Sequence, residues 1–330
     1  MPEVSIIMAN FNGAAFLGDA VASVRAQTLQ DWELIVVDDA SDDDSWRILA
    51  QAARADPRIR ILRQVLNQGP ANARNRALAE ARGQWIGIFD SDDVMKPERL
   101  ERLTDAARRL DARILADNQD LCSSRLAPER QLLSRADLRQ LDPVDLASFI
   151  DSSRLYSSLP DLGYLKPFVR ADLIAETGAR YDENLRIGED FHFVVRLLSS
   201  GARLHLLAEP LYCYRRHGSS ISHRLSPQII ASMIAADEGF AKSALPLSVA
   251  AHRALARRIR GLRSWAVHER AMQAFKERRF AAGLSAAVSR PHAWPLILRP
   301  IGVRLARVWR TFSASFRARR DGWMSVRGRA

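Results

Sequence analysis

The sequence has few cysteines and no long apolar runs, and both absences restrict what the protein can be. Only Cys122 and Cys213 are present, far apart, without the spacing of a zinc site and too few for a disulfide framework. We therefore predict a reducing, cytoplasmic setting. No run of about 18 apolar residues occurs and the N-terminus lacks the pattern of a signal peptide, so we expect a soluble protein or one at the inner face of a membrane.

Acidic residues are scarce at the C-terminal end of the chain. The formal net charge is +11, but residues 251–330 hold 19 Lys and Arg against three acidic residues, whereas residues 1–250 hold 30 against 35. The charge is therefore +16 in the last 80 residues and −5 before them. Such a distribution predicts an acidic body that does the chemistry and a basic tail that meets an anionic partner.

The tail from Pro295 to Arg320 has the pattern of a basic amphipathic helix, with Ile301, Leu305, Val308 and Phe312 on one side and Arg299, Arg304, Arg307 and Arg310 beside them. Such a helix can lie on an anionic membrane surface. The alternative is a helix that packs on the body and exposes a solvated basic face. We expect no nucleic-acid partner, because an acidic binding edge repels phosphate when no metal is bound.

The first third of the chain alternates between strands and helices. Short apolar runs of strand type occur at Val4–Met8, Leu34–Val37, Ile59–Leu62 and Trp85–Phe89, with helical spacing of apolar residues between them. This alternation predicts an α/β fold with a largely parallel sheet covered by helices on both faces. Ligands of such sheets bind beyond the carboxyl ends of the strands.

From about residue 100 the alternation weakens. We expect a helix at Glu98–Leu110, a strand at Ile114–Ala116, an irregular polar stretch to about Tyr164, a helix at Phe191–Leu198 and a strand at Leu204–Tyr214. Residues 224–330 read as helices rich in Ala and Arg. We therefore predict a catalytic domain at 1–223, with a donor-binding half to about 115 and an acceptor-binding half from 116, followed by a helical basic extension.

Two acidic clusters follow predicted strands, Asp38-Asp39 after the second and Asp90-Ser91-Asp92-Asp93 after the fourth. Carboxylates gathered at one edge repel one another unless a cation neutralises them, and oxygen ligands suit Mg²⁺ or Mn²⁺ bound together with substrate phosphates. The alternative is that they are turns and helix caps, where Asp and Ser are common. We favour that alternative for 42–44 and the metal for Asp90 and Asp92.

Six stretches in order resemble the family 2 glycosyltransferases of the GT-A fold: Val4–Gly13, Val36–Ser41, Gly69–Asn75, Phe89–Asp93, Gly188–Asp190 and Tyr214–Ser220. The resemblance covers roughly the first two thirds of the chain. Within the family, Ala116–Asn118 and the lead into Asp90 are most similar to bacterial exopolysaccharide glucosyltransferases of the succinoglycan type. The resemblance implies a hexose transferred from a UDP-sugar, with UDP-glucose expected, to a saccharide acceptor, including a lipid-linked one.

The resemblance also assigns roles to residues. It implies that the nucleotide sugar is bound by Asn10, Asp38, Asp39, Arg74, Asp90, Asp92, Arg216 and His217, and that Asp92 and Asp90 hold the metal, with Asp93 as an alternative ligand. On the sequence alone, Arg74 is equally well a solvent-facing helix residue and His217 a plain surface histidine. A guanidinium suits phosphate and base oxygens.

Asp190 is the candidate general base that takes the proton of the acceptor hydroxyl. It precedes a predicted helix, so the alternative is a helix cap. A single displacement without a protein nucleophile inverts the anomeric centre.

Other functions fit less well. A sugar-phosphate nucleotidyltransferase needs a Gly-rich basic loop after the first strand, where this chain has Asn10-Phe11-Asn12-Gly13. A receiver module that binds Mg²⁺ is far shorter than this chain. A non-catalytic member of the family would not need the complete set of acidic motifs that this chain has.

Overall fold

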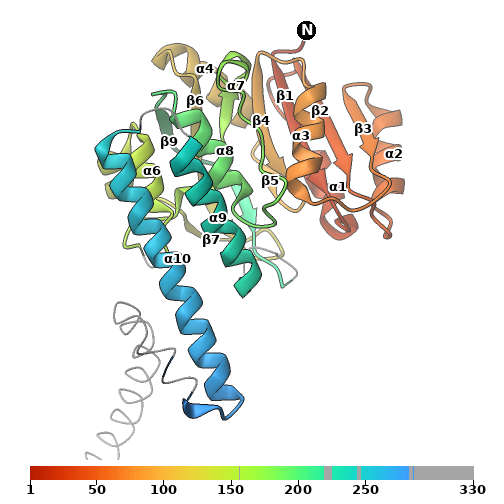
Figure 1. Cartoon of the computed structure of the whole chain (residues 1–330). Helices are drawn as coiled ribbons and strands as arrows, with labels where there is room; N and C mark the ends of the chain where they lie inside the picture. The colour runs from red at the N-terminus through yellow and green to blue at the C-terminus, as the bar shows by residue number, and fades with distance from the viewer. Residues whose placement is uncertain (156, 219–224, 244–246, 282–284, 286–330) are drawn as a thin grey trace, which may run out of the picture. The chain divides into compact units, whose positions relative to one another are not determined.

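The computed structural model describes residues 1–155, 157–218, 225–243, 247–281 and 285 (Figure 1). Contacts divide the chain into Met1–Ile259 and Arg260–Ala330, so the second unit begins within helix α10 (Val249–Lys276). In the described part of the chain, no helix is both long and apolar enough to cross a bilayer. The predicted tail helix from Pro295 to Arg320 lies outside the described residues.

The four strands predicted from the apolar runs all form, as β1 (Val4–Asn10), β2 (Trp32–Asp38), β3 (Ile59–Arg63) and β4 (Trp85–Asp90). They pair in parallel in the order β3-β2-β1-β4, and α1 (Ala14–Arg25), α2 (Ser45–Ala55) and α3 (Pro70–Glu80) connect them (Figure 1). Side chains alternate between the two faces. Ile7 and Ile35 belong to one core cluster, whereas Ile6 and Leu34 belong to the other.

The second half of the fold extends this sheet with mixed strand directions. The added strands are β5 (Val94–Met95), β6 (Ile114–Cys122), β7 (Pro128–Gln131), β8 (Phe168–Arg170) and β9 (Leu204–Arg215). The order continues from β4 through β8, β6 and β9 to β5, with β7 paired to β6. The remaining helices are α4 (Arg99–Leu110), α5 (Arg135–Leu141), α6 (Leu146–Ser152), α7 (Ala171–Thr177), α8 (Glu189–Leu198) and α9 (Pro227–Ser243), with a 3₁₀ turn at Leu162–Tyr164.

We expected an irregular polar stretch up to about Tyr164, and this prediction is wrong for much of that stretch. Strand β6 continues through Asp117, Asn118 and Asp120, and every residue in it is buried. Its polar side chains have partners: Asn118 Nδ2 donates to the carbonyl of Leu133 at 2.9 Å, and Lys96 Nζ lies 2.8 Å from Asp120 Oδ2. Hydrophobic periodicity predicted the start of this strand at Ile114–Ala116 but missed its continuation, because the buried positions beyond Ala116 are filled by paired polar groups.

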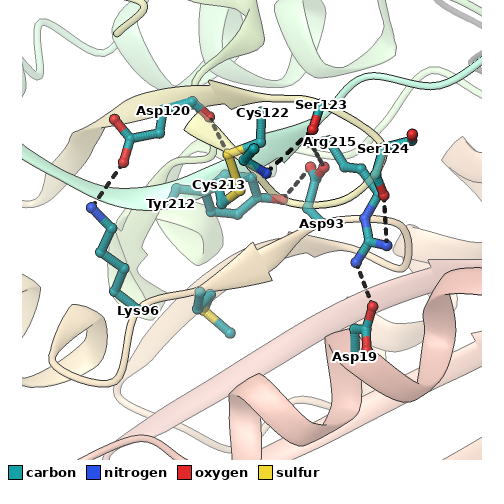
Figure 2. Close-up of a disulfide and its surroundings, with 12 residues drawn as sticks. Asp19, Asp93, Lys96, Asp120, Cys122, Ser123, Ser124, Tyr212, Cys213 and Arg215 are labelled. Carbon is teal, nitrogen blue, oxygen red and sulfur yellow. Dashed lines mark hydrogen bonds and ion pairs between the residues drawn. A yellow bond between two sulfur atoms is a disulfide. The ribbon is translucent and has the colours of Figure 1, made fainter. Parts of the chain in front are cut away.

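The two cysteines are joined in a disulfide, which the cysteine count did not predict. Strands β6 and β9 are parallel neighbours, and this brings Cys122 and Cys213 to a Cα separation of 6.0 Å (Figure 2). The disulfide could not be predicted because the two cysteines are 91 residues apart in the sequence and meet only through the pairing of β6 with β9. The expectation of a reducing compartment therefore loses the support that it drew from the cysteines.

Residues after 223 include part of the first unit. Asp237 of α9 is fully buried and lies 3.0 Å from His192 Nε2 and 3.1 Å from Arg258 Nε. The guanidinium of Arg258 also lies 3.7 Å from the ring centroid of Phe191. These contacts fix α9 and the start of α10 against α8. A separate role for residues 224–330 stays a prediction.

A buried ion pair ties α4 to β6 and gives a stability prediction. Arg99 and Asp117 are each 1% exposed, with Arg99 Nη2 2.9 Å from Asp117 Oδ1. Arg99→Met would leave the carboxylate buried without its partner, so we expect the free energy of unfolding in urea to fall by about 3–5 kcal/mol. Arg102→Met is the control, because Arg102 lies on the same helix as Arg99 and its ion pair with Glu209 of β9 is exposed. An equal loss in both variants would contradict the prediction.

Candidate active site

The two acidic clusters meet where β1, β2 and β4 end, at what we call the carboxyl edge of the sheet. In the parallel register Asn10 of β1 pairs with Asp38 of β2, and Ala9 pairs with Asp90 of β4. The segments that follow these strands therefore begin side by side, as the sequence pattern predicts.

Asp38 and Asp39 are buried and bonded to the surrounding loops. Asp38 Oδ1 accepts hydrogen bonds from Asn10 Nδ2 at 3.0 Å and Ser41 Oγ at 2.6 Å. Asp39 accepts the backbone amide of Gly69 at 2.8 Å, and burial raises the pKa of Asp39 although backbone amides oppose that shift. Both carboxylates thus shape the edge itself. Asn10 Oδ1 is buried and accepts no hydrogen bond from the described residues.

Arg74 is the centre of a buried ionic network. Its Nη2 lies 2.7 Å from Asp90 Oδ1, and its Nη1 lies 2.8 Å from Glu189 Oε1 and 3.4 Å from Asp190 Oδ1. The side chain is 7% exposed, so the solvent-facing alternative is wrong. Burial lowers the pKa of Arg74, but Asp190, Asp90 and Glu189 outweigh it and raise that pKa well above the usual value. Arg74 is therefore a fixed cation between the two acidic segments.

Lys166 is a second buried cation in this network, and no sequence pattern marks it. Its Nζ lies 2.6 Å from Asp90 Oδ2 and 3.1 Å from Asp190 Oδ2, and its side chain is 5% exposed. Burial opposes the positive charge, but the two carboxylates raise the pKa of Lys166 well above its usual value. Burial likewise raises the pKa of Asp90, but Lys166 and Arg74 outweigh it and lower that pKa. Arg74 and Lys166 are therefore held as cations and Asp90 as an anion.

Asp90, Asp92 and Asp93 form the candidate metal site. Each offers one oxygen, and these oxygens all lie within 4.8 Å of one another. Burial raises the pKa of Asp93 well above its usual value, and Asp92 and Asp90 raise it further. This mutual repulsion, together with an all-oxygen donor set, fits Mg²⁺ or Mn²⁺. Asp90 already faces Arg74 and Lys166, so its carboxylate is partly neutralised by protein groups.

Strand β9 supports this cluster from its far side. Asp93 accepts hydrogen bonds from the Tyr212 hydroxyl and the Arg215 amide, each at 2.7 Å (Figure 2). The Arg215 guanidinium lies 2.9 Å from Asp19 of α1, so β9 also connects the cluster to α1. The neighbouring Arg216 is 53% exposed and pairs with Glu129, and its predicted contact with the nucleotide stays a prediction.

His217 follows β9 and contacts the cluster directly. Its Nε2 lies 2.9 Å from Asp92 Oδ2, and its ring centroid lies 4.4 Å from that of Phe16. The side chain is 10% exposed, so the alternative of a plain surface histidine is wrong. The residues Ser219 and Ser220 that follow lie outside the described residues.

Asp190 lies in the first turn of α8 but does not occupy the capping position. The N-cap is Gly188, which has a φ of 90° that favours glycine, and its cap makes no side-chain hydrogen bond. The two oxygens of Asp190 instead face Lys166 and Arg74. Its Oδ1 is buried and has no hydrogen-bond partner in the described part of the chain. This geometry favours the general-base hypothesis over the helix cap.

Comparison with known proteins identifies the family. The sequence model described as "Glycosyl transferase family 2" matches residues 5–157. The succinoglycan biosynthesis protein ExoO of Rhizobium meliloti is 35% identical over 308 residues, which cover 93% of this chain and 87% of ExoO. The chain belongs to glycosyl transferase family 2. A second relative of this transferase, ExoU of the same organism, is 31% identical over 229 residues, 67% of this chain and 64% of ExoU.

Solved structures agree with the fold of this family 2 transferase. TarS 1–349 of S. aureus in complex with UDP-GlcNAc superposes with a TM-score of 0.63 at 19% identity, over 78% of this chain and 71% of that one. The mannosyltransferase PcManGT of Pyrobaculum calidifontis, in complex with GDP-Man and Mn²⁺, gives 0.57 at 18% identity, over 95% and 83%. The predicted GT-A fold is therefore confirmed. Family membership also decides against the nucleotidyltransferase and the receiver module.

Sequence reasoning missed four residues of this transferase that contact the site: Glu189, Lys166, Tyr181 and Tyr212. Glu189 lies within a motif, but from the sequence only its neighbour Asp190 is assigned a role. The other three stand in apolar or turn-like segments with no charge pattern. Tyr181 is 3% exposed, lies under the Arg74 guanidinium at 5.5 Å and has a buried hydroxyl without a hydrogen-bond partner. Only tertiary contacts could reveal these roles.

Proposed function

We propose that this glycosyltransferase inverts the anomeric centre of a hexose that it moves from a UDP-sugar to an acceptor hydroxyl in exopolysaccharide assembly, with UDP-glucose as the first donor to test. The observation that carries the proposal is the juxtaposition at the carboxyl edge. A cluster of carboxylates suited to a metal-bound diphosphate lies beside Asp190, a carboxylate with one buried oxygen that accepts no hydrogen bond from the described residues. Relatives named for succinoglycan biosynthesis support the pathway class.

The donor would be held by both halves of the edge. Asp92 and Asp90, joined by Asp93, would hold Mg²⁺ or Mn²⁺, which when bound neutralises the charge of the diphosphate leaving group. Asn10, Asp38 and Asp39 would contact the nucleoside. The structures of TarS with UDP-GlcNAc and of PcManGT with GDP-Man and Mn²⁺ support a nucleotide sugar and a divalent metal as ligands of this fold.

Asp190 would accept the proton of the acceptor hydroxyl through Oδ1. The acceptor oxygen then forms a bond to C1 as the bond from C1 to the diphosphate breaks on the opposite face, so an α-linked donor gives a β-linked product. Lys166 and Arg74 contact the two oxygens of Asp190 and so hold this carboxylate in place beside the metal cluster. Arg74 and Lys166 each contact both Asp190 and Asp90 of the metal cluster, so they would fix the base relative to the bound donor.

The donor can be identified from binding alone. We expect UDP-glucose, among a panel that includes UDP-N-acetylglucosamine and GDP-mannose, to raise the melting temperature of the protein only when Mn²⁺ is present. A ligand that binds the folded state stabilises it in proportion to the logarithm of its concentration over Kd. Stabilisation by GDP-mannose alone would contradict the uridine donor and leave the transferase assignment intact.

The basic tail supports a further part of the proposal, attachment to an anionic membrane that presents a lipid-linked acceptor. Each Arg near such a surface contributes about 1 kcal/mol, and the attraction weakens as the Debye length falls from about 8 Å at physiological salt to about 3 Å at 1 M. We expect the full-length chain to co-sediment with phosphatidylglycerol vesicles at low salt. Replacement of Arg299, Arg304, Arg307 and Arg310 by Gln should release it. Equal sedimentation of both proteins would contradict the attachment.

A further inference from the structure

Lys166 connects the two parts of the site that must act together. One ammonium group contacts a carboxylate of the metal cluster, Asp90 at 2.6 Å, and the candidate base, Asp190 at 3.1 Å. Both contacts use the Oδ2 atoms. Arg74 reaches the same two residues on their Oδ1 side, but its short contacts go to Asp90 and Glu189, and Asp190 Oδ1 lies 3.4 Å away without a hydrogen bond. Lys166 therefore gives Asp190 the direct hydrogen bond that sets its orientation.

The backbone of Lys166 is fixed independently of its ammonium group. Its carbonyl accepts a hydrogen bond from Arg99 Nη2 at 3.0 Å, and Arg99 is itself held by the buried Asp117. The next carbonyl, that of Pro167, accepts the amide of Ile88 on β4 at 3.2 Å. A long side chain anchored at its base and buried along its length has few rotamers available. Its ammonium group is thus held at a set position relative to β4, the strand that ends at Asp90.

The remaining oxygen of Asp190 is the atom left for chemistry. Its Oδ1 accepts no hydrogen bond from the described residues, and Arg74 Nη1 lies 3.4 Å away. Buried polar atoms without a hydrogen bond are uncommon in folded proteins unless a ligand completes them. Tyr181, whose buried hydroxyl also lacks a hydrogen-bond partner among the described residues, belongs to the same network through its contact with Arg74. An acceptor sugar has several hydroxyls that can meet such atoms.

We propose that Lys166 is a positioning residue for the transfer reaction, whose ammonium group holds Asp190 by Oδ2 so that Oδ1 meets the acceptor hydroxyl. This inference rests on the proposed function. Lys166 does not touch the reacting atoms. It fixes the distance between the base and the donor-binding carboxylates, and small displacements of a base reduce catalysis strongly.

Steady-state kinetics with UDP-glucose and Mn²⁺ test the role. We expect Lys166→Met to lower kcat by about tenfold to a hundredfold while KM for the donor changes by less than about threefold. Lys166→Arg keeps the positive charge, so its kcat should be about fivefold or more above that of Lys166→Met. The matched control is Lys96→Met, because Lys96 also pairs with an aspartate, Asp120 at 2.8 Å, but outside this network. Its kcat should equal that of the wild type.

A double-mutant cycle separates positioning from a purely structural role. If Lys166 acts through Asp190, then Lys166→Met in the Asp190→Asn background lowers kcat no further. If the fold-losses of kcat in the two single variants multiplied in the double variant, the proposal would be overturned. A loss of kcat in Lys166→Met that is explained by a lower melting temperature of that variant would also overturn it. Wild-type turnover with an unchanged kcat in Lys166→Met would overturn it and leave the proposed function standing, whereas absence of turnover in the wild type with every donor would overturn both.

Discussion

Asp190→Asn is expected to lower kcat by about a hundredfold or more, with donor binding nearly intact. The amide keeps the shape of the side chain but cannot accept the proton of the acceptor hydroxyl. The Asp190 oxygens contact Lys166 and Arg74, and Asp190 is not among the proposed ligands of the metal, so the donor should still bind with Mn²⁺. Initial rates of UDP release and calorimetric binding of UDP measure the two effects separately.

The matched control for this substitution is Asp172→Asn. Asp172 occupies the same position in the first turn of α7 that Asp190 occupies in α8, and it pairs with Arg170 on the surface. A general role of acidic residues at helix N-termini would affect both variants alike. We expect turnover to be unchanged in Asp172→Asn. If Asp190→Asn lost only stability and kept its turnover, Asp190 would be a structural residue of α8.

Asp92→Ala is expected to weaken Mn²⁺-dependent binding of UDP by about a hundredfold or more and to abolish transfer, because the diphosphate would lose its bridging cation. Asp92 is the most exposed of the three clustered carboxylates, and its only described side-chain hydrogen bond is to His217. It is therefore best placed to exchange a protein contact for a metal. Calorimetry with UDP, with and without Mn²⁺, measures the effect.

Asp44→Ala is the control for Asp92→Ala. Asp44 lies in the other acidic segment, is 66% exposed and pairs with Arg47. Its removal should leave Mn²⁺-dependent binding unchanged. If Asp92→Ala also binds UDP with full dependence on Mn²⁺, then Asp90 or Asp93 is the direct ligand, and the same titration on Asp93→Ala would show a loss.

The first half of the fold could be predicted because its signals are local. The runs at β1, β2 and β4 are apolar on both faces, as buried parallel strands must be, and the acidic segments stand where those strands end. The start of β6 was predicted at Ile114–Ala116, but its continuation to Cys122 could not be, since the burial of that part depends on partners such as Arg99, which lies on α4. The pairing of Cys122 with Cys213 was concealed for the same reason.

The site was predicted where a motif carries it and missed where only tertiary packing does. Asp190 and the acidic residues after β4 lie in recognisable stretches, and parallel pairing brings those of β2 and β4 to one edge. Lys166 stands between a leucine and a proline, with no pattern to mark it. Its role follows from the place of β8 between β4 and β6, which puts the residues just before β8 beside Asp90.

Inversion at C1 is the central claim, and time-resolved ¹H NMR of donor hydrolysis tests it without knowledge of the acceptor. The full-length protein is incubated with UDP-α-glucose and Mn²⁺, and the sugar released to water is observed before mutarotation equilibrates it. A single displacement assisted by Asp190 predicts that β-glucose appears first and that Asp190→Asn slows its release. Release of α-glucose first, or release that proceeds equally well after Asp190→Asn, would contradict the account.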